Sequence, residues 1–119
     1  MKNQNALKRE AARAALSLVP EGKFIGIGSG STVDMFIEEL GKSRKMVSGC
    51  VPASESTRAS LVRAGLKVIS LNSGYPLGSY FDGADEINDE GVMIKGGGGA
   101  LTREKIIASS SENFICMVD

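Results

Sequence analysis

Histidine and tryptophan are absent from this chain of 119 residues, and it contains only two cysteines. The lack of histidine excludes catalysis by Ser-His-Asp and Cys-His groups. A zinc site is not expected either, because such sites are built mostly from histidine and cysteine. Any proton transfer by this protein therefore has to use carboxylates and lysine.

The two cysteines, Cys50 and Cys116, each lie in a short apolar run that is typical of a buried strand. A chain of this length can bury most of the surface that its unfolded form exposes, so it does not need disulfides in order to fold. We expect two free, buried thiols rather than a disulfide or a nucleophile.

An excess of charge of one sign is also lacking, because 14 Lys and Arg residues balance 14 Asp and Glu residues. No basic field is available to attract nucleic acid or an anionic membrane. No apolar run approaches the ~20 residues that span a bilayer, and the N-terminus leads into a charged segment rather than a signal peptide. The sequence predicts a cytoplasmic protein that binds a small molecule, with neither nucleic acid nor a membrane as partner.

Short apolar runs alternate with helical patterns along the chain. Apolar residues at helical spacing predict helices over 5–19, 31–40, 54–64 and 100–110, the second and third ended by Gly41 and Gly65. Apolar runs predict strands over 24–27, 46–51, 66–71, 79–82, 92–94 and 114–118, with a turn-rich loop over 72–78. The predicted fold class is α/β, with residues 1–119 forming a single domain: a doubly wound, mainly parallel, Rossmann-like sheet with helices on both faces.

Ligands of such sheets bind beyond the carboxyl ends of the strands. The segment 26–32, Gly-Ile-Gly-Ser-Gly-Ser-Thr, joins a predicted strand to a predicted helix. Its glycines let the backbone approach a ligand, and Ser31 and Thr32 place hydroxyls at a helix N-terminus, which suits a phosphate. It matches neither the dinucleotide fingerprint nor the P-loop, so we favour a monophosphate site. The alternative is a tight turn with Ser31 or Thr32 as the helix N-cap.

Carboxylates gather after a later strand. Asp82 and Asp85 bracket Gly83 and Ala84 at a predicted strand end, where small residues let a substrate approach both carboxylates. A solvated acidic turn and a divalent cation site are the alternatives. The spacing of the acids does not match the calcium-binding loop, so no metal is expected.

Four successive glycines follow Lys95. Ordering four glycines costs much conformational entropy, and a flexible linker is the alternative explanation. Because the run lies between a predicted strand and a predicted helix, we interpret it as a loop moulded around a ligand, with Lys95 supplying positive charge. Glu104 follows in the first turns of that helix, where an interaction with the helix dipole is an ordinary explanation.

Three of these segments resemble one known family. The runs over 28–32, 82–86 and 95–105, in this order and at the expected separations, are similar to the signature segments of ribose-5-phosphate isomerase, type A. The resemblance extends from the first predicted helix to Asp119. It implies an enzyme of the pentose phosphate pathway that interconverts ribose 5-phosphate and ribulose 5-phosphate through an enediolate, with neither metal nor organic cofactor.

The resemblance also implies roles for residues. Glu104 is implied as the base that moves a proton between C2 and C1, and Asp82, Asp85 and Lys95 as the groups that handle the sugar hydroxyls and the developing oxyanion. The implied substrate-binding residues are Ser29, Gly30, Ser31, Thr32, Asp82, Gly83, Ala84, Asp85, Lys95, Gly96, Gly97 and Gly98. A closed pocket would raise the basicity of Glu104, and Lys95 with nearby backbone N–H groups would stabilise the charge on oxygen.

Members of that family are nearly twice as long, so we expect this chain to be a fragment or an incomplete sequence. A truncated chain is not expected to keep full activity. The full-length protein is expected to be a homodimer. The main alternative function is a non-catalytic sugar-phosphate-binding module of related fold, which has no need of Glu104 with Asp82, Asp85 and Lys95. A nucleotide-linked oxidoreductase is disfavoured by the incomplete fingerprint at 26–32.

Overall fold

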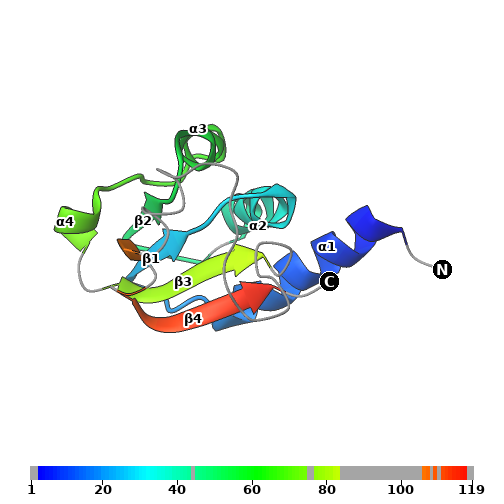
Figure 1. The fold of residues 1–119 in the computed structure, drawn as a ribbon, viewed down its shortest axis with the longest axis horizontal. Coiled ribbons are helices and arrows are strands. Elements are labelled where there is room, and N and C mark those ends of the chain that lie inside the picture. The colour runs from blue at the N-terminus through cyan, green and yellow to red at the C-terminus, as the bar shows by residue number, and fades with distance from the viewer. Residues whose placement is uncertain are drawn as a thin grey trace.

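A computed structural model of the chain describes residues 3–43, 45–74, 77–83, 106–107, 109 and 111–117 (Figure 1). Its strands form a four-stranded sheet in the order β2-β1-β3-β4, and every pairing is parallel. The strands are β1 (Phe24–Ile27), β2 (Gly49–Pro52), β3 (Leu77–Gly83) and β4 (Ser111–Met117). The helices are α1 (Gln4–Ala15), continued by the 3-10 turn η1 (Leu16–Leu18), α2 (Ser31–Lys42), α3 (Glu55–Arg63) and α4 (Leu71–Gly74). The predicted parallel α/β sheet is confirmed.

Local capping explains where α3 begins and ends. The Ser54 hydroxyl accepts a hydrogen bond from the Thr57 N–H at 3.1 Å, which satisfies a helix donor that has no partner within the helix. At the other end Gly65 has a φ of 79°, and Leu66 N–H donates to the Leu61 carbonyl at 3.0 Å. This is the Schellman arrangement that glycine favours after a helix, so the predicted end at Gly65 is confirmed.

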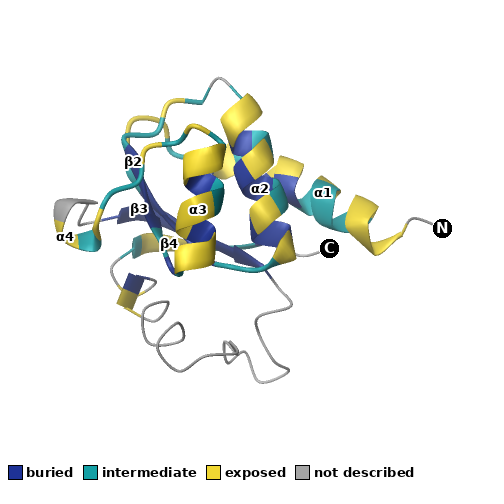
Figure 2. Cartoon of the chain, turned by 90° about the horizontal axis from the view of Figure 1, so that it is seen from above, coloured by how far each residue is buried: buried dark blue, intermediate teal, exposed yellow. Residues whose placement is uncertain are grey.

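The larger part of the core lies on one face of the sheet. Ile25 and Ile27 of β1 and Phe81 of β3 pack there against apolar residues of α1, α2 and α3. The rings of Phe36 and Phe81 stack with centroids 4.8 Å apart. In Figure 2 the strands β2 and β3 are buried and the outward sides of α2 and α3 are exposed, as expected for helices that cover a sheet.

A smaller cluster covers the opposite face. It is made of Val51, Ala53, Leu77, Tyr80 and Ile107. Ile106, Ile107 and Ser109 are helical, so helical residues pack on both faces, as the doubly wound pattern predicts. That residues 1–119 form a single domain stays a prediction.

Several predicted boundaries differ from the observed ones, and two of the differences have a clear physical reason. The strand expected over 66–71 is reduced to one bridge between Val68 and Cys50, and the chain then enters α4 within the expected loop. Short apolar runs do not distinguish a strand from other buried segments, which explains the error. Gly41 does not end α2, which continues to Lys42; a Cβ at Gly41 would lie 2.9 Å from the Ala64 carbonyl oxygen, so this glycine instead allows close packing of α2 and α3.

The cysteines differ from each other in burial. Cys50 is fully buried, as predicted, whereas Cys116 is only half-buried because β4 is the most exposed strand of the described sheet. Neither forms a disulfide. The expected strand at 92–94 lies outside the described residues, as does most of the expected helix over 100–110. Within the described part of the chain, no helix has the length and apolar character needed to cross a membrane.

Candidate functional site

The connections of the sheet reverse direction between β1 and β3. From β1 the chain passes through α2 to β2 on one side, and β3 then pairs with the other side of β1. Open α/β sheets bind ligands in the crevice at such a reversal, beyond the carboxyl ends of the strands. The two chain segments that leave this crevice are 28–30 after β1 and the end of β3 at Asp82 and Gly83.

Asp82 is held at the centre of this edge. Its side chain is fully buried, and both carboxylate oxygens accept hydrogen bonds: Oδ2 from the Tyr80 hydroxyl at 2.7 Å and Oδ1 from the Gly83 N–H at 2.9 Å. A carboxylate whose two oxygens each have a donor is fixed in orientation, because turning it would break at least one of these bonds.

Gly28 makes room for this carboxylate. A Cβ at Gly28 would overlap the Asp82 side chain, and the Gly28 N–H donates to the Phe81 carbonyl at 2.8 Å. The Gly28 carbonyl in turn accepts a hydrogen bond from the buried Thr57 hydroxyl at 2.7 Å, which ties the loop to α3. At Gly28 the close neighbour is therefore the chain's own aspartate, and the binding of a phosphate by this loop stays a prediction.

The loop continues directly into α2. Gly30 is the N-cap, with a φ of 115° that favours glycine, and Ser31 and Thr32 are the first helical residues. The alternative in which Ser31 or Thr32 caps the helix is therefore wrong. Thr32 is buried, whereas the Ser31 side chain accepts a hydrogen bond from Lys8 Nζ at 2.7 Å.

Lys8 is a residue that sequence reasoning missed. It lies in α1, 23 residues before Ser31, and its ammonium group reaches the first turn of α2. Backbone N–H groups and the helix dipole favour an anion at a helix N-terminus, and a nearby ammonium adds to that preference. No local pattern marks Lys8 as special, because its position depends on how α1 packs against α2.

The predicted site residues divide into two sets. Ser29, Gly30, Ser31 and Thr32 follow β1, and Asp82 and Gly83 end β3, so the structure brings these six to the same edge of the sheet. The other predicted residues lie outside the described part of the chain: Ala84, Asp85, Lys95, Gly96, Gly97, Gly98 and Glu104.

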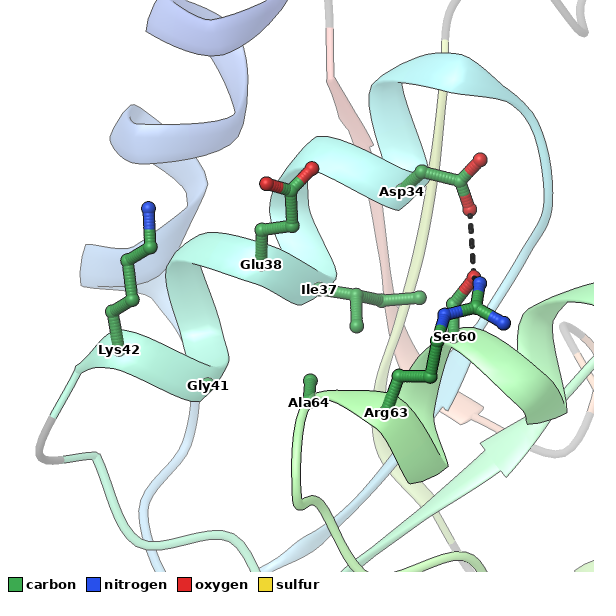
Figure 3. Close-up of a pocket in the computed structure, with 8 residues that line it drawn as sticks. All are labelled: Asp34, Ile37, Glu38, Gly41, Lys42, Ser60, Arg63 and Ala64. Atoms are coloured by element: carbon green, nitrogen blue, oxygen red, sulfur yellow. Dashed lines mark hydrogen bonds between the residues drawn. The ribbon is translucent and has the colours of Figure 1, made fainter.

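A separate groove of about 430 Å³ lies between α2 and α3, and none of the predicted site residues within the described part of the chain lines it (Figure 3). The Ser60 hydroxyl donates to Asp34 Oδ1 there at 3.4 Å, and Arg63 and Lys42 add positive charge. Burial raises the pKa of the Asp34 carboxyl, while the Ser60 hydrogen bond and the Arg63 charge oppose the shift. Across the described residues, no group of three or more acidic, cysteine or histidine side chains is arranged to hold a metal ion.

Comparison with known proteins identifies the family of the chain. The family described as ribose 5-phosphate isomerase A (phosphoriboisomerase A) matches residues 49–119. The chain belongs to this family. The resemblance seen in the motifs is thus confirmed over more than half of the sequence.

Curated members of the ribose 5-phosphate isomerase A family match over nearly the whole chain. The ribose-5-phosphate isomerase A of Mannheimia succiniciproducens is 52% identical over 117 residues, covering 98% of this chain and 53% of that protein. The protein of the same name from Neisseria gonorrhoeae is 51% identical over 119 residues, again covering 53% of its length. The chain therefore spans about half the length of these curated relatives.

Solved structures of ribose 5-phosphate isomerases share the fold. The Neisseria gonorrhoeae ribose 5-phosphate isomerase A superimposes with a TM-score of 0.88 at 48% identity, covering 100% of this chain and 56% of that one. A D-ribose-5-phosphate isomerase in complex with phospho-erythronic acid gives a TM-score of 0.85 at 30% identity, covering 99% and 56%. The expectation that the chain corresponds to part of a longer protein agrees with these shares.

Proposed function

We propose that the full-length protein interconverts D-ribose 5-phosphate and D-ribulose 5-phosphate. The observation that carries this proposal is the buried Asp82 carboxylate, held beside the glycine-rich loop and the N-terminus of α2 at the reversal point of the sheet. Such an edge offers an anion-binding end and a carboxylate end a short distance apart. A sugar phosphate has matching groups, a phosphate at one end and hydroxyls along the rest.

The phosphate is assigned to the loop over 29–32. The first N–H groups of α2 have no acceptors within the helix, and Lys8 brings an ammonium to the Ser31 hydroxyl. These groups favour a dianion over a neutral sugar end. The phosphate would then contribute binding energy to the ground state and the transition state alike.

The proton transfer is assigned to Glu104. In the open-chain aldose Glu104 would remove the proton from C2, leaving an enediolate whose charge on oxygen is stabilised by Lys95 and by N–H groups of the loop over 96–98. Glu104 would then return the proton to C1, while a hydroxyl proton passes between O2 and O1 with the help of Asp82 and Asp85. No redox cofactor is needed, because the substrate is oxidised at C2 and reduced at C1.

One described contact supports bringing Glu104 to this edge. Ile107, only three residues later in the sequence, packs so closely on β1 that a Cβ at Gly26 would lie 2.6 Å from Ile107 Cγ2. Gly26 pairs with Tyr80, and the side chain of Tyr80 lies on the same face of the sheet as that of Asp82. The base and the buried carboxylate are thus proposed to work from one face.

The non-catalytic binding module is not favoured, since the curated relatives cited above carry the name of an isomerase. A sugar phosphate as ligand agrees with the complex of a related isomerase with phospho-erythronic acid. The homodimer and the cytoplasmic location stay predictions.

The test is conversion of ribose 5-phosphate to the ketose by the full-length protein. Replacing Glu104 by glutamine keeps the size of the side chain but removes its basicity, so kcat should fall by about 100-fold or more. The matched control is Glu112→Gln, since Glu112 is an exposed residue of β4. Near-normal turnover by the Glu104 variant would assign the base to another residue, and binding without turnover by the wild-type protein would favour the module.

A further inference from the structure

We infer that Tyr80 is a positioning residue for the isomerase reaction: its hydroxyl holds the Asp82 carboxylate in the orientation that the substrate requires. The inference rests on the proposed function and adds to it a residue that lies inside the sheet. Tyr80 does not need to touch the substrate for this role. It acts through Asp82.

The hydrogen bond between the two side chains is short and buried. The Tyr80 hydroxyl donates to Asp82 Oδ2 at 2.7 Å, and both residues are fully buried. The second oxygen, Oδ1, accepts from the Gly83 N–H at 2.9 Å. A hydrogen bond from a neutral donor to a charged acceptor is stronger than one between neutral groups, so the phenol is an effective restraint on the carboxylate.

The tyrosine ring is itself held in place. Gly26, its partner on β1, has no side chain, and a Cβ there would lie 2.9 Å from Tyr80 Cδ1. On β4 the Phe114 ring lies against it, with centroids 5.3 Å apart and planes tilted by 56°. A ring packed on both sides cannot swing away, so the position of its hydroxyl is fixed by the sheet.

Two glycines, one in β1 and one in the loop after it, leave space for two side chains of the neighbouring strand β3. Gly26 leaves space for the Tyr80 ring, and Gly28 leaves space for the Asp82 carboxylate, since a Cβ at either position would overlap its neighbour. Residues two apart in extended chain lie on the same face, so the pair of glycines opposes the tyrosine and aspartate pair. The spacing Gly-x-Gly at the end of β1 thus matches Tyr-x-Asp in β3.

A purely structural role is the competing explanation. A buried tyrosine hydroxyl needs an acceptor, and Asp82 would supply one whether or not it acts on a substrate. The two explanations differ in what loss of the hydroxyl changes. A structural hydroxyl contributes to stability alone, whereas a positioning hydroxyl changes kcat and does so only while Asp82 is present.

The experiment is a double-mutant cycle in the full-length protein with Tyr80→Phe, Asp82→Asn and both together. Tyr80→Phe keeps the ring and removes only the hydroxyl, and kcat for ribose 5-phosphate should fall about 10- to 100-fold. KM should change little, because the phosphate end is untouched. In the Asp82→Asn background the same change should alter kcat by no more than about twofold, as expected for residues that act through one another.

A binding measurement extends the cycle to proteins with little turnover. Phospho-erythronic acid carries a planar carboxylate beside a hydroxyl, like the enediolate, and its affinity for the four proteins can be measured by calorimetry. Tyr80→Phe should weaken the binding of phospho-erythronic acid about tenfold when Asp82 is present, and should leave it unchanged in the Asp82→Asn background. This is the same coupling between Tyr80 and Asp82, measured without chemistry.

Leu40→Ala is the control, since Leu40 is a buried residue of α2 in the core cluster on the other face of the sheet, and the change leaves Tyr80, Phe114 and Asp82 in place. It should lower the melting temperature while kcat stays within about twofold of the wild type. A normal kcat for Tyr80→Phe, or losses that simply add in the double variant, would overturn the positioning role while leaving the isomerase activity intact. A wild-type protein without turnover would overturn the proposed function and the inference together.

Discussion

At the residue scale, the close approach of Gly28 to Asp82 leaves no space for a larger side chain at position 28. A Cβ at position 28 would overlap the buried carboxylate, so Gly28→Ala has to displace Asp82 or separate β1 from β3. Overpacking of this kind costs about 1–3 kcal/mol. We expect a lower melting temperature and a loss of turnover of at least about tenfold, because the displaced carboxylate is the one assigned to the substrate.

Gly78→Ala is the control for this substitution. Its Cβ would meet the flexible Lys23 side chain at 3.1 Å and Pro20 at 3.2 Å, and Gly78 is a residue of β3 like Asp82. The expected change in stability is small, below about 1 kcal/mol. Equal effects of the two alanines on turnover would contradict the idea that Gly28 is required by Asp82.

Cys50 gives a second prediction for a single residue. Burial raises the pKa of its thiol to about 12, so almost no thiolate is present at pH ~8. In the folded protein Cys50 should therefore resist alkylation by iodoacetamide at that pH, and it should react after unfolding in guanidinium. Peptide mass analysis measures both. Equal labelling of Cys50 in the two states would contradict the prediction.

At the scale of the element, α1 and α2 are joined by ion pairs around Glu39. Arg9 Nη1 lies 2.9 Å from one carboxylate oxygen and Arg13 Nε 3.1 Å from the other, and the Glu39 side chain is only 11% exposed. Glu39→Gln should lower the free energy of unfolding at neutral pH by about 1 kcal/mol, measured by urea denaturation. Glu38→Gln is the control, because Glu38 is 56% exposed and 3.8 Å from Arg9; a larger loss there would contradict the prediction.

The same carboxylate predicts a dependence on pH. The Arg13 hydrogen bond, with the Arg9 hydrogen bond and nearby positive charge, lowers the pKa of Glu39 below its ordinary value of 4.5. A carboxyl group with a lowered pKa in the folded state stabilises the fold above its unfolded pKa and loses this effect as the pH falls through the folded value. The difference in unfolding free energy between wild type and Glu39→Gln should therefore be constant near neutral pH and shrink below about pH 4.5. A difference that grows on acidification would contradict the assignment.

The elements also show what sequence patterns can and cannot predict. The helix over 54–64 is predictable because its cap at Ser54 and its glycine at Gly65 are local signals. The role of Gly41 is not predictable in the same way, since it depends on Ala64 of another helix. The same holds for Lys8, which is marked only by its contact with Ser31. The loop over 28–32 and the end of β3 can be found because the connectivity of an α/β sheet brings them together.

For the whole molecule, the candidate site depends on three parts of the chain that are distant in sequence. The loop after β1 supplies the N-terminus of α2, the end of β3 supplies Asp82, and α1 supplies Lys8. A sugar phosphate that contacts all three would bind only the folded protein. Such a ligand raises the free energy of unfolding by about 2.7 kcal/mol at roughly 100 times its dissociation constant. Ribose 5-phosphate should therefore raise the melting temperature of the full-length protein.

Lys8 allows the phosphate end of the site to be tested separately from the reacting end. Its ammonium reaches Ser31 at the start of α2 rather than Asp82. Lys8→Gln should therefore weaken the binding of the substrate and the binding of the transition state equally. KM for ribose 5-phosphate should rise about tenfold with little change in kcat, and the thermal shift caused by the ligand should shrink. Lys67→Gln, at an exposed lysine, is the control and should change neither. A fall in kcat with unchanged KM would instead assign Lys8 to the reacting end of the sugar. The substrate would then lie in the opposite direction along the sheet edge.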